Sequence, residues 1–386
     1  MKILFWFSIA ALIHSYFLYP ALLLLFAKFY KHNSIVYENE IELPEVTVIM
    51  AVRNAEKVIE KKIRSIFESG YIKDKIHFLI GSDASDDNTD SIIHKLEKEF
   101  PRIYFYRFNQ RLGKIAIVNK LFEKSKSEIL ILTDVHAFPE KGAILNLVKH
   151  FKNQEINVVG GKLRNLRKDR KGIAYEEDSF LKFEFWLKNA EGKIWGTMMG
   201  AYGAFYAIRK SVFTKVPDNF IVDDFYISIK AIEKKGRAIC EPEAVAYENV
   251  PGDINTEFKR KTRISMGNFQ NLKALFPVLY KRNMALSLAF FSHKIIRWTG
   301  PVLLIIIILS SGTLSRSGYF YHIFFIMMVL TFLAPIIDYF CRKIQIHVLI
   351  LRFITHFYYM NLALLYGMFK FMKGVKTNVW EPTKRE

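Results

Sequence analysis

The fold of this 386-residue chain is decided by stretches such as Ile129-Leu130-Ile131-Leu132-Thr133-Asp134-Val135-His136, in which a carboxylate directly follows a short, apolar, β-branched run. Ile80-Gly81-Ser82-Asp83-Ala84-Ser85-Asp86-Asp87 has the same design, and a third acidic pair occurs in Ile221-Val222-Asp223-Asp224-Phe225. In a parallel α/β sheet, such carboxylates stand at the carboxyl ends of strands, where open sheets bind ligands. The three acidic stretches together predict a site for a nucleotide and a metal ion.

Around these stretches, apolar strands alternate with amphipathic helices. We expect strands at 46–50, 76–80, 103–106 and 129–133, and helices at 58–69, 90–100 and 115–125. This alternation predicts an α/β fold with a doubly wound, mostly parallel sheet. No G-x-G-x-x-G or P-loop pattern occurs, so a dinucleotide-binding fold of that kind and a P-loop are not supported. After Asp134 the pattern loosens, and the expected elements are a strand at 158–163, a helix at 175–190, a loop and strand at 200–208 and a closing segment at 238–247.

The composition favours a protein that works at a membrane. The formal net charge is +19, which can indicate a nucleic acid, an anionic membrane or a polyanionic substrate as partner. No nucleic-acid-binding motif is present, whereas long apolar segments lie near both ends. The two cysteines, Cys240 and Cys341, are far apart and match no zinc spacing. A disulfide framework is therefore not expected, and a reducing compartment fits.

The first apolar segment, Ile3–Ala27, has no formal charge apart from the titratable His14. It is long enough to cross a hydrocarbon layer of ~30 Å. A cleaved signal peptide is the alternative, but the run is too long and no small-residue cleavage site follows it. Because Lys28 and Lys31 come next, the following domain should be cytoplasmic.

The C-terminal third returns to the membrane. Phe291-Ser292-His293-Lys294-Ile295-Ile296-Arg297-Trp298 has the composition of a helix in the headgroup layer. The span candidates are Pro301–Leu309 with its flanks, Phe320–Phe340 and Leu349–Phe371. Three spans would place the basic tail outside, against the positive-inside tendency, so one segment, most readily the last, is expected in the interface or as a re-entrant element. The predicted organisation is a transmembrane anchor at 1–30, a catalytic domain at 40–272, an interface helix at 284–298, membrane helices at 299–373 and a basic tail at 374–386.

From Val46 to about Asn271 the chain resembles a family 2 glycosyltransferase with the GT-A fold, of the membrane-bound cellulose synthase-like superfamily. The motifs occur in the family's order. Val48–Glu56 resembles its opening strand and turn, Gly81–Asp87 its uracil-side acidic turn, Arg111-Leu112-Gly113-Lys114 its basic helix start, Thr133–His136 its DxD metal motif, and Val222-Asp223-Asp224 its base motif. One helix before the domain, an interface helix and further membrane helices after it are also the layout of membrane-bound polysaccharide synthases.

Two departures from the family pattern affect what the resemblance implies. His136 stands where DxD has its second acid, although histidine can also ligate a divalent metal or bind a phosphate. The QxxRW signature of processive synthases is absent, and Arg260-Lys261-Thr262-Arg263-Ile264 stands in its place. The second departure argues against processive chain growth without arguing against sugar transfer.

The resemblance implies a role for each motif residue. Asp134, with His136 beside it, would bind Mg²⁺ or Mn²⁺, and Asp224, with Asp223 as its partner, would be the general base. Asp83 would accept hydrogen bonds from the uracil or ribose of the donor. The remaining donor-binding candidates are Ala51, Arg53, Asn54, Glu56, Arg111, Lys114, Arg260 and Arg263, and the acceptor-binding candidates are Gly200, Ala201, Tyr202 and Trp186.

Each of these assignments has a plainer alternative. Asp134 could only cap a helix, and the Asp223–Asp224 pair would in any case favour the dipole of the helix it begins. Arg111 could be a solvated surface residue, and Arg260 and Arg263 could bind anionic headgroups instead of the diphosphate. Aromatic residues such as Trp186 and Tyr202 are more often core residues than sugar platforms.

The sequence therefore predicts an inverting, metal-dependent glycosyltransferase. It would move a sugar from a nucleotide-diphosphate sugar, with a UDP-sugar expected, to a membrane-associated glycan or lipid-linked saccharide. The expected location is a bacterial plasma membrane with the catalytic domain in the cytoplasm, as a single chain or a homo-oligomer, with no nucleic acid partner. The alternatives are a processive polysaccharide synthase with an export channel and a catalytically silent scaffold that binds nucleotide or glycan.

Overall fold

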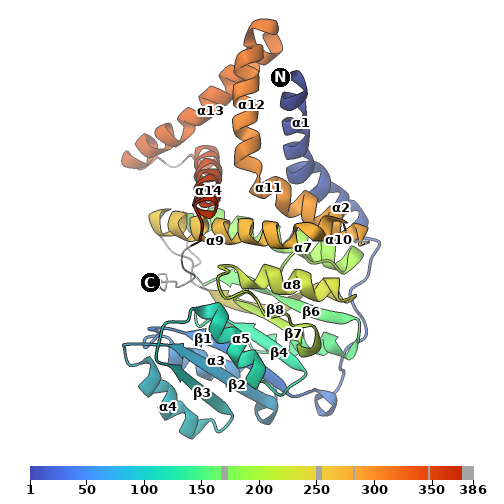
Figure 1. Cartoon of the computed structure of the whole chain (residues 1–386), viewed down its shortest axis with the longest axis vertical. Helices are drawn as coiled ribbons and strands as arrows, with labels where there is room; N and C mark the ends of the chain where they lie inside the picture. The colour runs from blue at the N-terminus through green and yellow to red at the C-terminus, as the bar shows by residue number, and fades with distance from the viewer. Residues whose placement is uncertain (167–172, 249–253, 281–282, 347, 376–386) are drawn as a thin grey trace.

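The computed structural model describes residues 1–166, 173–248, 254–280, 283–346 and 348–375. Figure 1 shows an α/β domain on one side and a group of long helices on the other, with the N-terminus among the long helices. Of the predicted basic tail at 374–386, residues from 376 onward lie outside the described part.

One eight-stranded sheet forms the α/β domain, with the order β3-β2-β1-β4-β7-β6-β8-β5. The neighbours from β3 to β4 are parallel, β7 runs antiparallel between β4 and β6, β6 and β8 are parallel, and β5 is antiparallel to β8. The strands are β1 (Val46–Val52), β2 (Ile76–Asp83), β3 (Ile103–Phe108), β4 (Ile129–Thr133), β5 (Ala137–Pro139), β6 (Ile156–Asn165), β7 (Phe205–Arg209) and β8 (Arg237–Glu248). The parallel half is the part that the alternating pattern predicted.

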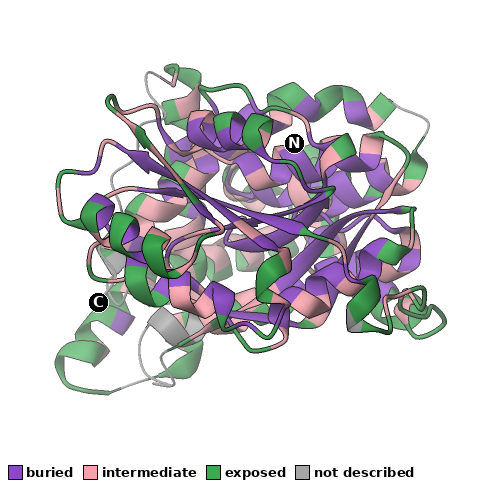
Figure 2. Cartoon of the chain, turned by 90° about the horizontal axis from the view of Figure 1, so that it is seen from below, coloured by how far each residue is buried: buried purple, intermediate pink, exposed green. Residues whose placement is uncertain are grey.

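Helices cover both faces of the sheet, and Figure 2 shows the buried strands running between them. They are α3 (Ile59–Phe67), α4 (Thr89–Glu99), α5 (Lys114–Lys124), α6 (Ala143–Val148), α7 (Ile173–Trp195) and α8 (Asp223–Glu233). The alternation along β1 divides the core in two, because Val48 and Met50 pack on one face while Ile49 and Ala51 pack on the other. Two elements, β5 and α6, were not predicted from the sequence, and they are only 3 and 6 residues long.

The N-terminal segment is one continuous rod, made of α1 (Lys2–Ile13), a π-helical stretch at His14–Leu18 and α2 (Tyr19–Ala27). After the α/β domain come α9 (Ile254–Leu275), α10 (Met284–Ala289), a second π-helical stretch at Phe290–Ile295, α11 (Ile296–Trp298), α12 (Gly300–Leu314), α13 (Tyr319–Lys343) and α14 (Leu349–Met372). Within the described residues, three helical segments are long and apolar enough to cross a membrane, at Lys2–Ala27, Gly300–Ser317 and Tyr319–Lys343. Figure 1 shows α1 beside α12, in agreement with their contacts.

α14 is not among these three segments, and it packs along α9 at the boundary between the long helices and the α/β domain. The expectation that one C-terminal segment, most readily the last, lies in the interface or re-enters stays a prediction. The two helices approach closely at Gly367, because a Cβ there would lie 2.4 Å from Cβ of Ser265. The Ser265 hydroxyl donates to the Leu364 carbonyl at 2.8 Å.

A buried polar junction joins the N-terminal rod, α7 and the second π-helical stretch. The His293 ring lies between two carboxylates of α7, with Nδ1 2.8 Å from Glu191 Oε1 and Nε2 3.0 Å from Glu184 Oε2. The Tyr19 hydroxyl also donates to Glu191 Oε1, at 2.9 Å, and Arg297 Nη1 donates to Glu184 Oε2 at 3.3 Å. Burying these groups is tolerated only because they satisfy one another, so this junction defines how the domain sits against the membrane helices.

The close approach of α9 and α14 gives a first prediction. We expect Gly367→Ala to separate the two helices and to destabilise the protein by about 1–3 kcal/mol, as overpacking generally does. The measurement is the thermal unfolding midpoint of the detergent-solubilised protein. Gly300→Ala is the matched control, because a Cβ at Gly300 would make an ordinary contact, 3.5 Å from Asn361 Oδ1. Equal midpoints for the two variants would contradict the predicted packing.

Candidate active site

Four predicted site residues meet at the carboxyl edge of the parallel half of the sheet. Asp134 follows β4, Lys114 begins α5, and Asp223 and Asp224 begin α8. The Lys114 ammonium stands between the acids, with Nζ 2.9 Å from Asp134 Oδ1 and 3.7 Å from Asp223 Oδ1. The structure thus brings together residues that are about 110 positions apart in the sequence.

Charge dominates this group. Burial by itself lowers the pKa of Lys114, but attraction to Asp134, Asp223 and Asp224 outweighs burial and raises that pKa. Lys114 therefore stays charged, and its positive charge holds the carboxylates close. Three carboxylates against one ammonium give the group a surplus of negative charge.

Asp224 is held rigidly at the start of α8. Its Oδ2 accepts a hydrogen bond from the Gly203 N–H at 2.7 Å, and its Oδ1 accepts one from the Phe225 N–H at 2.7 Å. A Cβ at Gly203 would lie 2.8 Å from Asp224 Oδ2, so only glycine allows this approach. Burial, and then repulsion by Asp223, raise the pKa of Asp224 despite these hydrogen bonds. A carboxylate whose proton affinity is raised in this way suits a general base.

The turn after β4 carries Asp134 and His136. The Ala137 N–H donates to the Asp134 carbonyl at 3.2 Å, which closes the turn, and the Asp134 N–H donates to Ala204 at 3.2 Å. Val135 between them is buried, whereas Asp134 and His136 are partly exposed. The two predicted metal ligands therefore lie on one short turn at the edge of the site.

Asp83 has a structural task that the sequence did not suggest. It is only 3% exposed, and its carboxylate accepts hydrogen bonds from the N–H groups of Leu112 (2.7 Å) and Gly113 (3.2 and 3.3 Å). These bonds fix the loop that ends at Lys114 and contains Arg111, which is partly buried. Asp83 therefore positions the basic helix start. Its predicted contact with the uracil or ribose stays a prediction.

The loop after β1 fastens the loop after β2. Arg53 Nη1 donates to the main-chain carbonyls of Asp83 and its successor, both at 2.8 Å. The Glu56 N–H donates to Asp87 Oδ2 at 3.1 Å, and Asn54 takes a left-handed conformation with φ 47°. Arg53, Asn54 and Glu56 thus build the wall of the site next to Ala51, which is buried near the end of β1.

Arg260 lies in an ion-pair cluster with carboxylates of α7 and α9. Its guanidinium donates to Glu257 (Nε at 2.8 Å) and to Glu177 (Nη2 at 3.1 Å), and Lys261 Nζ also donates to Glu177, at 2.6 Å. Arg263 is on the same helix, α9. The cluster anchors α9 to α7. The two roles predicted for Arg260, binding the diphosphate or binding anionic headgroups, did not include this anchoring.

The acceptor candidates from 200 to 202 lie against the start of α8. The Ala201 N–H donates to Ser228 Oγ at 3.0 Å, and the Tyr202 hydroxyl donates to a main-chain carbonyl of α7 at 3.2 Å. Gly200 has φ +79°, and a Cβ there would lie 2.6 Å from the Phe225 ring. Both this glycine and Gly203 allow the strap 200–203 to approach α8, so the strap forms one side of the site.

Trp186 lies elsewhere. Its ring stacks on Phe183 and packs against the apolar cluster that contains Tyr19 and Leu23 of the N-terminal rod. This placement favours the core alternative for Trp186, because the cluster joins α7 to a membrane helix. A helical pattern shows that α7 has an apolar face but not which neighbour that face meets.

Lys188 is a site residue that the sequence analysis missed. Its ammonium lies 3.9 Å from the centre of the Tyr202 ring, a cation–π distance, and the residue is buried. Burial, and then repulsion by Lys294, lower the pKa of Lys188 to about 8, although Glu184 and Asp224 counteract them. The sequence does contain a signal that could have identified Lys188, namely a lysine inside the aromatic run of α7, because a charge in an apolar stretch needs a partner.

The residues present fit a divalent cation that is bound together with a phosphate-bearing ligand. In the part of the chain that the structure describes, no three His, Cys, Asp or Glu side chains cluster in a way that could hold a metal alone. Mg²⁺ and Mn²⁺ sites often use one or two protein ligands and complete their coordination with substrate phosphates. Asp134 and His136 would supply those ligands, and the surplus of carboxylates around Lys114 favours added positive charge.

Lys62 supports the turn that carries Asp134 and His136. It is 0% exposed, and its amine donates to Thr133 Oγ1 at 2.8 Å and to the Ala137 carbonyl. Lys62 therefore binds the turn on both sides of Asp134 and His136. Thr133 Oγ1 in turn donates to the Ala204 carbonyl at 2.9 Å, which links this turn to the strap beside Asp224.

The burial of Lys62 gives a second prediction. Burial lowers the pKa of Lys62 to about 7, although Asp134 and Glu248 counteract it. Between pH 7 and 9 the unfolded chain keeps a proton on this lysine that the folded protein releases, so stability should rise with pH. The neutral amine still has two N–H donors for its two partners.

The measurement is the difference in thermal unfolding midpoint between wild type and Lys62→Met at pH 7 and at pH 9. We expect the wild type to gain stability relative to the variant as the pH rises. Lys61→Met is the matched control, because Lys61 is the exposed neighbour, and its difference from wild type should not change with pH. A Lys62→Met difference that is constant or falls would contradict the prediction.

Comparison with known proteins identifies related sequences. The family models described as glycosyl transferase family 2 and glycosyl transferase family group 2 match residues 47–216 and 172–337. A probable glycosyltransferase, YdaM, of Bacillus subtilis is 25% identical over 60% of this chain and 57% of its own length. A β-monoglucosyldiacylglycerol synthase of Trichormus variabilis is 26% identical over 37% of this chain and 30% of its own length. The chain thus spans less than two thirds of each of these relatives.

A solved structure shows the same fold over nearly the whole chain. The mannosyltransferase PcManGT of Pyrobaculum calidifontis, in complex with GDP-Man and Mn²⁺, superimposes with a TM-score of 0.71. The match covers 96% of this chain and 99% of that one, at 20% sequence identity. The predicted fold class, an α/β domain of the GT-A type with helices before and after it, is thereby confirmed.

Proposed function

Because the chain belongs to the family 2 glycosyltransferases, we propose that it transfers a sugar, with inversion, from a nucleoside diphosphate sugar to a lipid-linked or glycolipid acceptor at a membrane. The observation that carries the proposal is the meeting of Lys114, Asp134, Asp223 and Asp224 at one sheet edge. Such a group offers a carboxylate base beside a place for a charged diphosphate.

Asp224 takes the proton of the acceptor hydroxyl in this mechanism. The Gly203 and Phe225 N–H groups hold its two oxygens, which leaves further lone pairs for an acceptor. As the hydroxyl attacks the anomeric carbon, its proton passes to Asp224 and the bond from that carbon to the diphosphate breaks. One base and one direct displacement invert the anomeric configuration.

Positively charged residues on the other side of the site from Asp224 would bind the donor. Lys114 begins α5 and Arg111 lies in the loop just before it, and the N-terminal end of the helix also favours an anion. Asp134 and His136 would hold Mg²⁺ or Mn²⁺, which when bound offsets negative charge on the departing diphosphate. The loop made by Arg53, Asn54 and Glu56 and fastened to the Asp83 loop would receive the nucleoside.

The nucleoside is proposed to be uridine, as the family resemblance implies. The structural relative from Pyrobaculum calidifontis is a complex with GDP-Man, so guanosine is the specific second candidate. Tyr202, with Lys188 over its ring, is proposed to face the acceptor. Arg260 and Arg263 would contribute to donor binding from α9. The Arg260 guanidinium also donates a hydrogen bond to Glu257.

Two features support a membrane-associated acceptor. Three helical segments within the described residues could span a bilayer. Some relatives are named for acceptors of this kind. One is a β-1,3-glucosyltransferase of Campylobacter jejuni whose name includes a diphosphate-linked undecaprenol, and it is 27% identical over 39% of this chain and 50% of its own length.

One span before the domain and two after it would leave the domain and the basic C-terminal residues on the same side, which we propose is the cytoplasmic side of a bacterial plasma membrane.

The main test uses membranes that contain the protein, with Mg²⁺ or Mn²⁺ and a panel of UDP- and GDP-sugars. We expect release of nucleoside diphosphate from one donor and a loss of at least about 100-fold in Asp224→Asn, the scale of a lost general base. Asp74→Asn is the matched control, because Asp74 is exposed and lies outside the site. Sizing the product separates single addition from a polymer. No release from any donor by folded protein would favour a catalytically silent scaffold.

A pH profile tests the role of Asp223. Repulsion by Asp223 contributes to the raised pKa of Asp224, so Asp223→Asn should lower that pKa. The base would then stay ionised in more acidic solution, and the acidic limb of kcat/KM should move to lower pH. The measurement is kcat/KM from pH 5 to 8 for wild type and variant. An acidic limb that stays in place, or moves to higher pH, would contradict this arrangement.

A further inference from the structure

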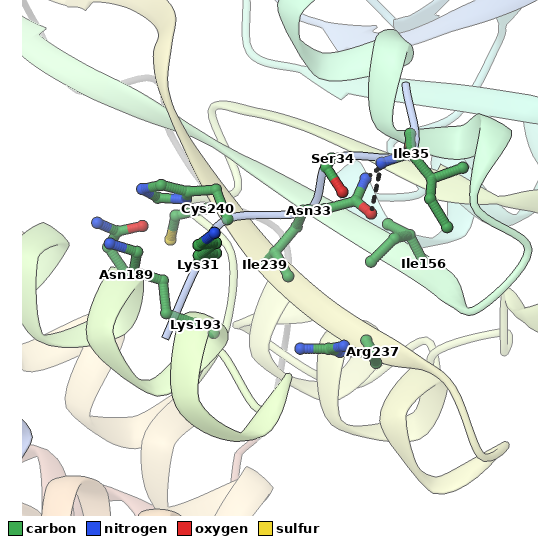
Figure 3. A pocket seen from close by; sticks show the side chains of 12 residues that line it. Lys31, Asn33, Ser34, Ile35, Ile156, Asn189, Lys193, Arg237, Ile239 and Cys240 are labelled. Atoms are coloured by element: carbon green, nitrogen blue, oxygen red, sulfur yellow. Dashed lines mark hydrogen bonds between the residues drawn. The ribbon is translucent and has the colours of Figure 1, made fainter. Parts of the chain in front are cut away.

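A cavity of about 200 Å³ lies at the edge of the sheet opposite to the acidic group. Its walls come from the linker after the N-terminal rod, from the last turns of α7 and from the start of β8 (Figure 3). Because β6 runs parallel to β4, the first residue of β6, Ile156, marks the end of the sheet away from Asp134. The cavity is therefore separate from the acidic group.

Four basic side chains line this cavity, and no carboxylate does. Lys31 and His32 come from the linker, Lys193 from α7 and Arg237 from β8, and Figure 3 shows Lys31 and Lys193 near Asn189, with Arg237 further along the wall. Burial, and then repulsion by Lys193, lower the pKa of His32, although attraction to Glu241 counteracts them. Basic groups gathered from three separate elements suit an anionic ligand.

The walls of the cavity are built and held in place. Asn33 fixes the linker, since its side-chain oxygen accepts a hydrogen bond from Asn153 Nδ2 at 2.9 Å and its nitrogen lies 3.1 Å from His150 Nδ1. Gly196 makes room for Arg237, because a Cβ there would lie 2.7 Å from the Arg237 Nε, and its φ is +69°. These contacts hold the linker and leave room for Arg237 without a ligand.

The cavity lies close to the end of the N-terminal rod. Lys31 lies only four residues after the end of α2 at Ala27. On α7, Ala190 and Ile194 pack against Tyr19 and Leu23 of the rod, and Lys193 belongs to the same turns of that helix. A ligand in the cavity would thus be close to where the first membrane helix leaves the bilayer.

One polar atom in the cavity wall indicates what else the ligand carries. The Asn189 side-chain oxygen is buried without a hydrogen-bond partner among the described residues. A buried acceptor of this kind calls for a donor, such as a hydroxyl.

We propose that this cavity binds the phosphodiester headgroup of an anionic phospholipid, with a headgroup hydroxyl donating to Asn189. Lys193 and Arg237 bind the phosphate, and Lys31 closes the site from the linker. Occupation of the site would fix the rotation of the α/β domain relative to the bilayer. This inference concerns lipid binding and is independent of the sugar-transfer reaction.

The experiment titrates the full detergent-solubilised chain with phosphatidylglycerol or phosphatidylcholine and counts bound lipids by native mass spectrometry. We expect preferential retention of phosphatidylglycerol by the wild type. Lys193→Gln with Arg237→Gln should weaken it about tenfold or more, since each basic residue near a membrane contributes on the order of one tenfold factor or somewhat less. The matched control is Lys95→Gln with Lys98→Gln, which removes the same charge from α4 at the far end of the domain.

The charge-conserving pair Lys193→Arg with Arg237→Lys should retain the lipid, which distinguishes loss of charge from misfolding. Equal weakening in the α4 control, or equal retention of the two lipids by the wild type, would overturn the proposal. Competition provides the last arm. If inorganic phosphate or glycerol 3-phosphate displaces phosphatidylglycerol at equal concentration, the ligand is a soluble phosphate and the lipid assignment is wrong.

Discussion

One ammonium group, that of Lys114, makes the arrangement of the whole site possible. Asp134 and Asp223 come from different layers of the fold, and without a cation between them their carboxylates would repel each other. The position of that ammonium depends in turn on Asp83, which holds the main chain just before Lys114. The acidic stretches that follow β2 and β4 are thus parts of one electrostatic unit, in which the first positions the cation and the second is neutralised by it.

Much of the fold could be predicted from the sequence because its signals are local. The runs before Asp83 and Asp134 are apolar and β-branched, so they form buried strands wherever they lie, and the sheet then brings their ends to one edge. The predicted strand at 129–133 has the bounds of β4, and the predicted helix at 115–125 differs from α5 by one residue at each end. The three-residue strand β5 and the six-residue helix α6 are too short to leave a periodic pattern.

The rest of the site could not be predicted, because it depends on which face of one element meets another. Trp186 and Lys188 are two residues apart on α7, yet one packs against the N-terminal rod and the other lies over Tyr202. Similarly, Arg260 carries a charge that suits a diphosphate, but in the structure two buried carboxylates bind it. The role of Lys62 could not be predicted for the same reason, because only the packing of α3 shows that its amine reaches the turn at Asp134.

The polar junction at His293 has a consequence for the order in which the chain is made. Glu184 belongs to α7 in the middle of the α/β domain, but its partner His293 follows 109 residues later. At ribosomal rates of about 5 to 20 residues per second, these carboxylates wait roughly 5 to 20 seconds for their partners. During that interval the nascent domain must keep this face hydrated or bound by a chaperone. The contact between Tyr19 and Glu191 can form as soon as α7 has been made, whereas the junction is completed only after the chain has been extended to His293 and Arg297.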